Sequence, residues 1–544
     1  MTLKRSRLKS RLPTRAVLSP LGAHKSPAPE DAPAPRPASA RAADGARSSN
    51  PADRTVMSKR RLQRRVTPLE LLQEPLQAGL RKVFDLRRFL IVIGLTLLVL
   101  ILPTPEGLSP AGHRALALFV FTGSILALEP APLPIAALLV PICQIALGID
   151  TATGAFAPFG QPVLFLILGS LFLAEALRKH GLTRRIALFT IVWSGGNLPR
   201  LLLSMMVATG LLSMWVLNTA TAAVLIPVAI TIAQRVQPQE RAGRVLEVLI
   251  LGIAISSSIG GMGTLMGSGE NAIAGALLSQ TGAFGFLEWM QFGVPLVLLL
   301  LPLSWFLLMR SLPIGAVVID TDPAAGELSR LGGLRGAERE IVIVLAISMT
   351  LWITGGTLER ALGLPATLLS SAVVAIGAVA LLSIEEVVDW NDLKSVNWGV
   401  FFVIGAGLTM GDALGKTGAS AWFAEMLGPT LQTMPYWAVL SVLVLTGFVL
   451  TQFMNNVTLG AILAPVLITL GQAGGMDPVR LVLPTILAVA LAYTLPGGSA
   501  RMTLAAVTGA VDKNHMIRAG LVVGLPSVLV IWLFFYALVL IGWV

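Results

Sequence analysis

An asparagine in the middle of a long apolar stretch occurs twice in this chain, and this repeat is the strongest constraint on its fold. The first copy, residues 203–230, reads LSMMVATGLLSMWVLNTATAAVLIPVAI, and the second, residues 440–470, reads LSVLVLTGFVLTQFMNNVTLGAILAPVLITL. A straight helix across lipid gains nothing from an unpaired polar group, which costs several kcal/mol in hydrocarbon. Two helices that enter the membrane, turn halfway and return to the same side can use such a group at their turn. We therefore predict two re-entrant hairpins, at residues 200–233 and 436–471.

The bulk composition indicates an all-α polytopic membrane protein rather than a soluble domain. The chain of 544 residues is 55% hydrophobic and only 13% charged, whereas about 25% of a soluble domain is charged. The single cysteine, Cys143, excludes an internal disulfide framework. The sequence contains no His-Glu-x-x-His, Gly-x-Ser-x-Gly or Walker-type phosphate-loop pattern. We therefore expect neither an enzyme nor an ATP-driven pump.

The positive charge of the chain is concentrated at its N-terminus. Residues 1–88 hold 20 Lys and Arg against 7 Asp and Glu, whereas the remainder holds 20 against 22, so we expect no nucleic-acid-binding face. Residues 1–65 are rich in Pro, Ala, Ser and Arg and are predicted to be a disordered basic tail. Such a tail is either a transit peptide or lipid-binding arm, or an extension upstream of a start at Met57. Residues 66–88 are predicted to be an interfacial amphipathic segment, with the N-terminus in the cytoplasm and the protein in a bacterial inner membrane.

The apolar segments form two series with the same order. The first repeat, residues 89–310, has four spans, a hairpin, a glycine-interrupted span and a last span; the second, residues 341–544, has three spans before its hairpin. A polar linker at residues 311–340, expected in the cytoplasm, separates them. An odd number of crossings lies between the hairpins, so the repeats are predicted to be inverted. This gives about 11 transmembrane helices, two of them broken, and two re-entrant hairpins.

The two glycine-interrupted spans align with each other at their breaks. The sequence GSGEN at residues 267–271 corresponds to GSARM at residues 498–502. Glycines at these positions favour an unwound middle between two half-helices. We expect both breaks to meet the two hairpin turns near the membrane midplane, where helix N-termini favour an anion and unwound carbonyls favour a cation. The pattern predicts a secondary transporter of a small anion.

The repeat layout and the motif WVLNTATAAVLIPV at residues 215–228 resemble the divalent anion–sodium symporter family, which carries dicarboxylates, citrate or sulfate within the wider ion transporter superfamily. The resemblance covers about residues 89–543. It implies an elevator mechanism, a homodimer, and Na⁺ as the coupling ion with no other cofactor. The residues expected to contact the anion are Asn218, Thr219, Asn455, Asn456, Ser268, Ser499 and Arg501. The residues expected to bind the coupling cation are Ser213, Asn218 and Gly263 in the first repeat, and Thr451, Asn456 and Gly498 in the second.

The chain departs from the Ser-Asn-Thr signature that this family carries at each hairpin turn. Leu217 and Asn455 replace the two serines, and Val457 replaces the second threonine. Fewer hydroxyl groups are therefore present to bind a carboxylate. Proton coupling or anion exchange on the same fold remains an alternative to Na⁺ coupling, and a membrane receptor or scaffold that does not transport is an alternative of another class.

Two further departures introduce charge where the family has proline. Glu270 and Arg501 occupy equivalent positions in the two breaks. An ionised residue at the centre of a membrane helix costs about 2.5–3.5 kcal/mol, so each needs a partner or water. We expect the two side chains to face each other or the same aqueous cavity. Arg501 would then bind the anion with Glu270 as a proton carrier or competitor, or the two would form a structural pair.

A second pair of acidic residues also repeats. Glu175 and Asp412 each precede a lysine by four residues, Lys179 and Lys416 respectively. This spacing suits ion pairs along one face of a helix. We therefore predict a structural role for both pairs.

Overall fold

The computed structural model describes residues 84–282 and 284–543, and nearly all of their regular structure is helical. The exceptions are two short antiparallel strands, β1 (Val236–Gln237) and β2 (Val318–Ile319), in which Val236 pairs with Ile319. The predicted tail at residues 1–65 and most of the predicted amphipathic segment at residues 66–88 lie outside the described residues.

Three helices near the start of the described chain pack with a helix from much later in the sequence. The first begins at the N-cap Asp85, whose carboxylate accepts hydrogen bonds from the backbone N–H groups of Arg87 and Arg88. Their shared core contains buried side chains such as Leu118 and Val403. The four helices are α3 (Leu86–Ile101), α4 (Pro110–Leu128), α5 (Leu133–Ala146) and α18 (Trp398–Lys416).

A second group of helices is assembled around α7, which begins at a proline and bends by 45° from the short helix before it. A Cβ atom at Gly169 of α7 would lie 2.7 Å from the Cβ of Ala375, so glycine allows the close approach of α16. This group consists of α7 (Pro162–Lys179), α8 (Leu182–Ser194), α15 (Ala337–Leu362), α16 (Ser371–Ile384) and α17 (Trp390–Lys394), whereas the short helix α6 (Ala152–Phe156) contacts α5.

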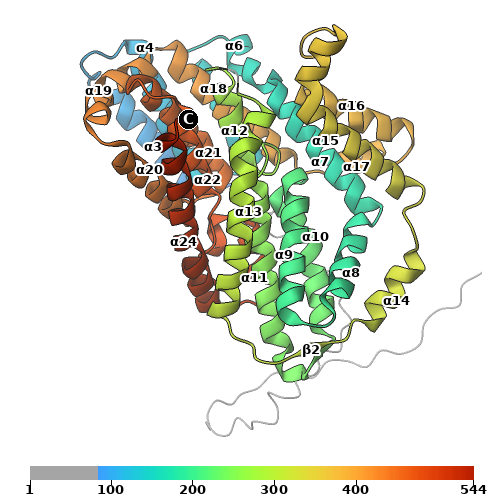
Figure 1. The fold of residues 1–544 in the computed structure, drawn as a ribbon. Coiled ribbons are helices and arrows are strands. Elements are labelled where there is room, and N and C mark those ends of the chain that lie inside the picture. The colour runs from blue at the N-terminus through green and yellow to red at the C-terminus, as the bar shows by residue number, and fades with distance from the viewer. Residues whose placement is uncertain (1–83, 283, 544) are drawn as a thin grey trace, which may run out of the picture. The chain divides into compact units, whose positions relative to one another are not determined.

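The two repeated stretches each form a pair of helices joined by a short turn. The first pair turns at Val216 and Leu217, and the second turns over residues 452–455. Figure 1 shows the first pair side by side, with α11 packed along it. The pairs are α9 (Leu198–Trp215) with α10 (Asn218–Ala233), and α20 (Tyr436–Thr451) with α21 (Asn456–Ala473).

The two interrupted helices form the centre of the core. Each consists of two helical pieces separated by a break in the α-helix, over residues 262–268 and 490–499, and the second break includes a single 3-10 turn at Pro496–Gly498. Every residue of the ranges 247–278 and 481–494 is buried. The second piece of each contacts a helix pair from the other half of the chain, α12 against α21 and α23 against α10. The pieces are α11 (Ala242–Gly261), α12 (Gly269–Leu278), α22 (Val479–Val489) and α23 (Ala500–Val507).

Some elements lie where the sequence predicted only loops or continuous spans. The predicted linker at residues 311–340 contains β2 and α14, and α8 and α19 are separate helices that precede the two helix pairs. In the described chain, seven helices are long and apolar enough to cross a membrane, or eight if the bent α6–α7 pair is one span. Several shorter apolar helices, such as α5 and α16, fall below that length. The remaining helices are α13 (Phe286–Ser311), α14 (Asp322–Leu331), α19 (Ala419–Thr433) and α24 (Lys513–Leu540).

Candidate functional site

Four helix N-termini border one cavity of about 780 Å³. The helices are α10, α12, α21 and α23, and both halves of the chain contribute two of them. Each N-terminus carries a partial positive charge and backbone N–H groups without helical partners. Four such ends at one cavity produce a positive potential that favours an anion. The lining residues at the four ends are Asn218, Thr219, Gly269, Glu270, Asn455, Asn456, Ser499, Ala500 and Arg501.

Two of the four helix ends lack a side-chain cap. Leu217 precedes α10 and has no polar side chain, and the hydroxyl of Ser268 before α12 makes no capping bond. In the other half, Asn455 Oδ1 accepts from the N–H of Val457 at 2.9 Å, and Ser499 Oγ accepts from the N–H of Met502 at 3.4 Å. At α10, however, the N–H of Asn218 donates to the carbonyl of Gly267 at 3.1 Å and the N–H of Thr219 donates to Asn218 Oδ1 at 2.8 Å. The first turn of α12 therefore has the greater donor capacity for a bound anion.

The first break is held by hydrogen bonds to the turn of the first helix pair. Ser213 Oγ donates to the carbonyl of Ser257 at 2.5 Å, and the hydroxyl of Thr264 donates to the carbonyl of Met214. The backbone N–H of Asn218 donates to the carbonyl of Gly267 at 3.1 Å. A Cβ atom at Gly267 would lie 2.4 Å from Gly261 O, so only glycine fits there. The turn and the break form one rigid unit.

This first break contains buried oxygen atoms without partners. Asn271 Nδ2 donates to the carbonyls of Gly261 at 2.8 Å and Thr264 at 2.9 Å, which leaves its Oδ1 unpaired. The Oγ of Ser268 is also buried without a partner. An unsatisfied buried acceptor costs about 1–3 kcal/mol, and a bound cation would remove that cost. Ser213, Asn218 and Gly263, expected to bind a cation, are all buried around this same break.

The second break is joined to its helix pair by Gln452, which sequence reasoning missed. Its Nε2 donates to the carbonyls of Phe448 and Leu491, at 2.7 and 3.0 Å. Its Oε1 accepts from the N–H groups of Tyr493 and Thr494 and from the Thr494 hydroxyl. The one available signal was an amide side chain in an apolar stretch, three residues before the asparagine pair. Gln452 fixes the turn against the unwound backbone.

The three residues expected to bind the second cation lie together. The Oγ1 of Thr451 is 3.0 Å from Asn456 Oδ1 and 2.6 Å from the carbonyl oxygen of Val489. A Cβ atom at Gly498 would lie 2.7 Å from the carbonyl oxygen of Thr451. Asn456 Nδ2 donates to Glu270 Oε1 at 3.2 Å. The second site is therefore in contact with the first half of the chain.

Glu270 and Arg501 line the same cavity although both are almost fully buried, with exposed fractions of 1% and 2%. Arg501 Nη2 donates to the carbonyl of Ala490 at 2.8 Å, while its Nε has no partner. Glu270 acts electrostatically on the guanidinium. Within the described chain, no nitrogen–oxygen distance of 4 Å or less joins the two side chains. The cavity, rather than a direct ion pair, is what they share.

The expected anion contacts differ in how they face this cavity. Thr219 and Asn455 are half-buried and line it, and Ser499 lines it from the N-cap of α23. Ser268 is only 2% exposed and is not part of the lining. Its hydroxyl lies instead with the unpaired oxygens of the first break.

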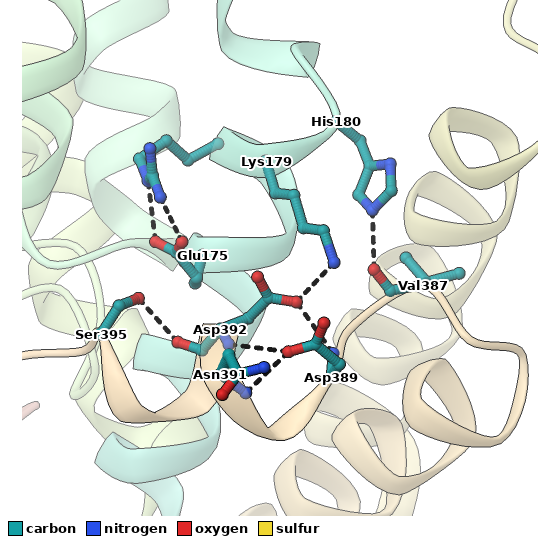
Figure 2. A network of polar contacts seen from close by, with 9 residues as sticks. Glu175, Lys179, His180, Val387, Asp389, Asn391, Asp392 and Ser395 are labelled. Atoms are coloured by element: carbon teal, nitrogen blue, oxygen red, sulfur yellow. Dashed lines mark hydrogen bonds and ion pairs between the residues drawn. The ribbon is translucent and has the colours of Figure 1, made fainter. Parts of the chain in front are cut away.

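The far side of the cavity is bordered by the end of α7 and the segment after α17, where the charged network of Figure 2 lies. The predicted pairing of Glu175 with Lys179 is wrong: Glu175 bonds Arg178, with an Nε–Oε2 distance of 2.8 Å. Lys179 Nζ instead lies 2.5 Å from Asp392 Oδ2 in α17. The other predicted pair is present, because Lys416 Nζ lies 2.7 Å from Asp412 Oδ2. Lys179 therefore pairs with Asp392 of another helix instead of with Glu175 of its own helix.

A family model described as "sodium:sulfate symporter transmembrane region" matches residues 84–543 of the chain. The chain belongs to this family. The match confirms the resemblance to divalent anion–sodium symporters that the hairpin motif indicated. Membership and the apolar helices together show a multi-pass membrane protein.

Individual relatives agree with this family assignment. The chain is 31% identical over 475 residues to the sodium-dependent dicarboxylate transporter SdcS of Staphylococcus saprophyticus, covering 82% of this chain and 89% of that protein. It is 29% identical to SdcS of Staphylococcus aureus over 468 residues, covering 81% and 89%. It is 30% identical to an uncharacterized transporter of Haemophilus influenzae over 435 residues, covering 78% and 91%.

A solved structure supports the fold alone. The YdaH transporter of Alcanivorax borkumensis matches with a TM-score of 0.50 at 15% sequence identity, covering 79% of this chain and 99% of that one. This chain therefore shares its helical architecture with a protein of very different sequence.

Proposed function

We propose that this protein is a Na⁺-coupled secondary transporter that moves a small di- or polyvalent anion across the membrane. The observation that carries the proposal is the convergence of four helix N-termini and one arginine on a single cavity. The names of its relatives, sodium-dependent dicarboxylate transporters, agree with such a substrate and with Na⁺ coupling. A transporter needs no covalent chemistry, and binding at a charged cavity is sufficient for the anion.

The anion would be bound by neutral donors and by one positive charge. Thr219 and Ser499 supply hydroxyl groups, and Asn218, Asn455 and Asn456 supply amides, all at the lining of the cavity. The Arg501 guanidinium adds a charge-assisted interaction through its unpaired Nε. Helix N-termini account for the remaining positive potential.

The first break would hold Na⁺. Ser213 Oγ and Asn218 Oδ1 can each offer an oxygen, and the backbone around Gly263 offers carbonyl groups. We place Ser268 here rather than with the anion, because its buried hydroxyl has no partner. A cation bound at this point would also hold the turn of the first helix pair in place for the anion.

The proposal includes the inverted-repeat architecture of the family. The pairs α9–α10 and α20–α21 would be re-entrant hairpins within repeats at residues 89–310 and 341–544, joined by a cytoplasmic linker at residues 311–340. Hairpins and broken helices would move together as the elevator against a dimeric scaffold. The basic segment before α3 would place the N-terminus in the cytoplasm of a cell with this protein in its inner membrane.

Uptake by proteoliposomes tests the proposal directly. Radiolabelled succinate, citrate and sulfate would each be offered with an inward Na⁺ gradient and, as the control, with choline. We expect uptake of at least one anion above that of protein-free vesicles, and only with Na⁺. Equal uptake in choline would replace Na⁺ coupling by proton coupling or exchange. Binding of an anion without any flux would favour a receptor.

A further inference from the structure

We propose that the Arg501 guanidinium occupies the place of a coupling cation in the second half of the molecule, so that Na⁺ binds only at the first break. This inference rests on the proposed function and concerns the number of cations used. The two breaks have equivalent positions in the chain but differ in which buried side-chain atoms lack a hydrogen-bond partner.

The C-terminal end of α22 is already occupied by a positive charge. Carbonyl groups at a helix C-terminus carry partial negative charge and attract cations. The carbonyl of Ala490, directly after α22, accepts from Arg501 Nη2 at 2.8 Å and also from the hydroxyl of Ser258. Both lone pairs of this oxygen are therefore in use. A Na⁺ ion at this helix end would have to displace the guanidinium.

The oxygens of Thr451, Asn456 and Gln452 beside the second break also have partners. The hydroxyl of Thr451 lies between Asn456 Oδ1 and the carbonyl oxygen of Val489. Glu270 holds the amide nitrogen of Asn456, which turns the amide oxygen toward Thr451. Gln452 Oε1 accepts from three donors. The Tyr493 hydroxyl and Arg501 Nε are buried here without partners, and each carries a proton to donate, unlike the pure acceptor Asn271 Oδ1 of the first break.

The first break contains a buried pure acceptor that has no partner. Asn271 Oδ1 and Ser268 Oγ are buried oxygens without partners, as a cation site requires. Asn271 corresponds to Met502 in the second break, where no side-chain oxygen is present. Ser268 corresponds to Ser499, whose Oγ already accepts from the N–H of Met502. The asymmetry therefore lies in the residue types as well as in the geometry.

Charge supports the same assignment. Glu270, equivalent to Arg501 in the repeat, does not serve its own break but bonds Asn456 and acts on Arg501 across the cavity. The second break thus has its own cation, Arg501, and the first half of the chain supplies the counter-charge, Glu270. A Na⁺ ion beside the Arg501 guanidinium would be repelled by its positive charge, because water screens a buried charge poorly.

Na⁺-dependent thermal unfolding of the purified full-length protein tests this inference without any anion. NaCl replaces choline chloride at constant ionic strength, and the Na⁺ concentration for half-maximal stabilisation is measured. Ser213→Ala and Thr451→Val are matched variants, since the two residues are equivalent in the repeat. We expect Ser213→Ala to raise this concentration about tenfold or more and Thr451→Val to change it by less than about twofold. Equal effects of both variants would overturn the inference.

Arg501→Gln provides a second, independent measurement. Without the guanidinium, Glu270 and the α22 carbonyl become available to Na⁺, so we expect lower stability in choline that Na⁺ restores, and a Hill coefficient for Na⁺ that rises from about one to about two. A wild-type coefficient of two, or no restoration in Arg501→Gln, would overturn the inference while leaving Na⁺ coupling intact. If Na⁺ neither stabilises the wild type nor drives uptake, Na⁺ coupling itself is wrong, and the inference with it.

Discussion

Lys179, the last residue of α7, places its Nζ 2.5 Å from Oδ2 of Asp392, which lies 213 residues later in the short helix α17 (Figure 2). A corresponding contact joins Lys416, the last residue of α18, to Asp150 just before α6, at 2.9 Å. In both cases a lysine at the end of one long helix, α7 or α18, pairs with an aspartate in or just before the short helix that precedes the other long helix. The two contacts therefore connect the halves of the chain in a reciprocal way.

We expect Lys179→Met to lower the free energy of unfolding by about 0.5–1 kcal/mol, because the pair is partly exposed to solvent. Burial tends to raise the pKa of Asp392, but hydrogen bonds from the Asp389 N–H and from Lys179 outweigh it and lower the pKa below its usual 3.8. The stabilisation is then present above that pH and is lost as the pH falls through the pKa of the folded state. Thermal unfolding of wild type and variant between pH 7 and pH 3, with nothing else changed, measures both effects.

Lys394→Met is the control for this pair, since Lys394 Nζ lies 3.4 Å from Asn391 Oδ1 and 6.0 Å from the centroid of the Trp390 ring, both in the same short helix. It should change stability little at any pH. A constant difference between wild type and Lys179→Met down to pH 3 would show that the variant acts through packing and not through the charge of Asp392.

The internal repeat made the central elements of the fold predictable. Asn218 and Asn456 do start the second helices of their pairs, and the breaks fall at GSGEN and GSARM, because glycine and polar residues are costly inside apolar helices. Partners chosen by tertiary packing could not be predicted. The sequence offers Glu175 to Lys179 at helical spacing, yet Asp392 from a distant segment takes that place. Gln452 likewise finds its partners on a segment 39–42 residues away.

Gln452→Met should destabilise the protein by about 2–4 kcal/mol, because the buried N–H groups of Tyr493 and Thr494 lose their acceptor. Gln144→Met is the matched control. Gln144 is fully buried, and neither atom of its amide has a hydrogen-bond partner. Methionine there should be neutral or stabilising. Chemical unfolding in detergent compares the two variants, and a larger loss in Gln144→Met would contradict the hydrogen-bonding account of Gln452.

Close packing of α12 on α21 depends on Gly460. A Cβ atom there would lie 2.6 Å from the Cβ of Glu270 and 2.9 Å from its Cα, so the two helices would have to separate. We expect Gly460→Ala to cost about 1–3 kcal/mol and to weaken anion binding by displacing Glu270. Gly377→Ala, inside α16 with no atom within 4 Å of the added Cβ, should instead stabilise by about 0.5–1 kcal/mol. The melting temperatures of both variants without ligand measure the difference, and similar values would exclude steric control at Gly460.

Thr219 tests whether the hydroxyl groups at the cavity contribute to anion affinity. It lies half-buried at the N-terminus of α10 and lines the cavity. Its hydroxyl makes a long hydrogen bond of 3.4 Å to Asn218 Oδ1. A hydrogen bond to a charged group contributes about 1.5–3 kcal/mol, so Thr219→Val should weaken anion binding by about tenfold or more. Thr231→Val is the control, because Thr231 is in the same helix, donates to the carbonyl of Pro227 and is not part of the cavity lining. Isothermal titration of the anion at saturating Na⁺ measures both affinities. An unchanged affinity in Thr219→Val would assign anion recognition to the helix ends and Arg501 without the hydroxyl.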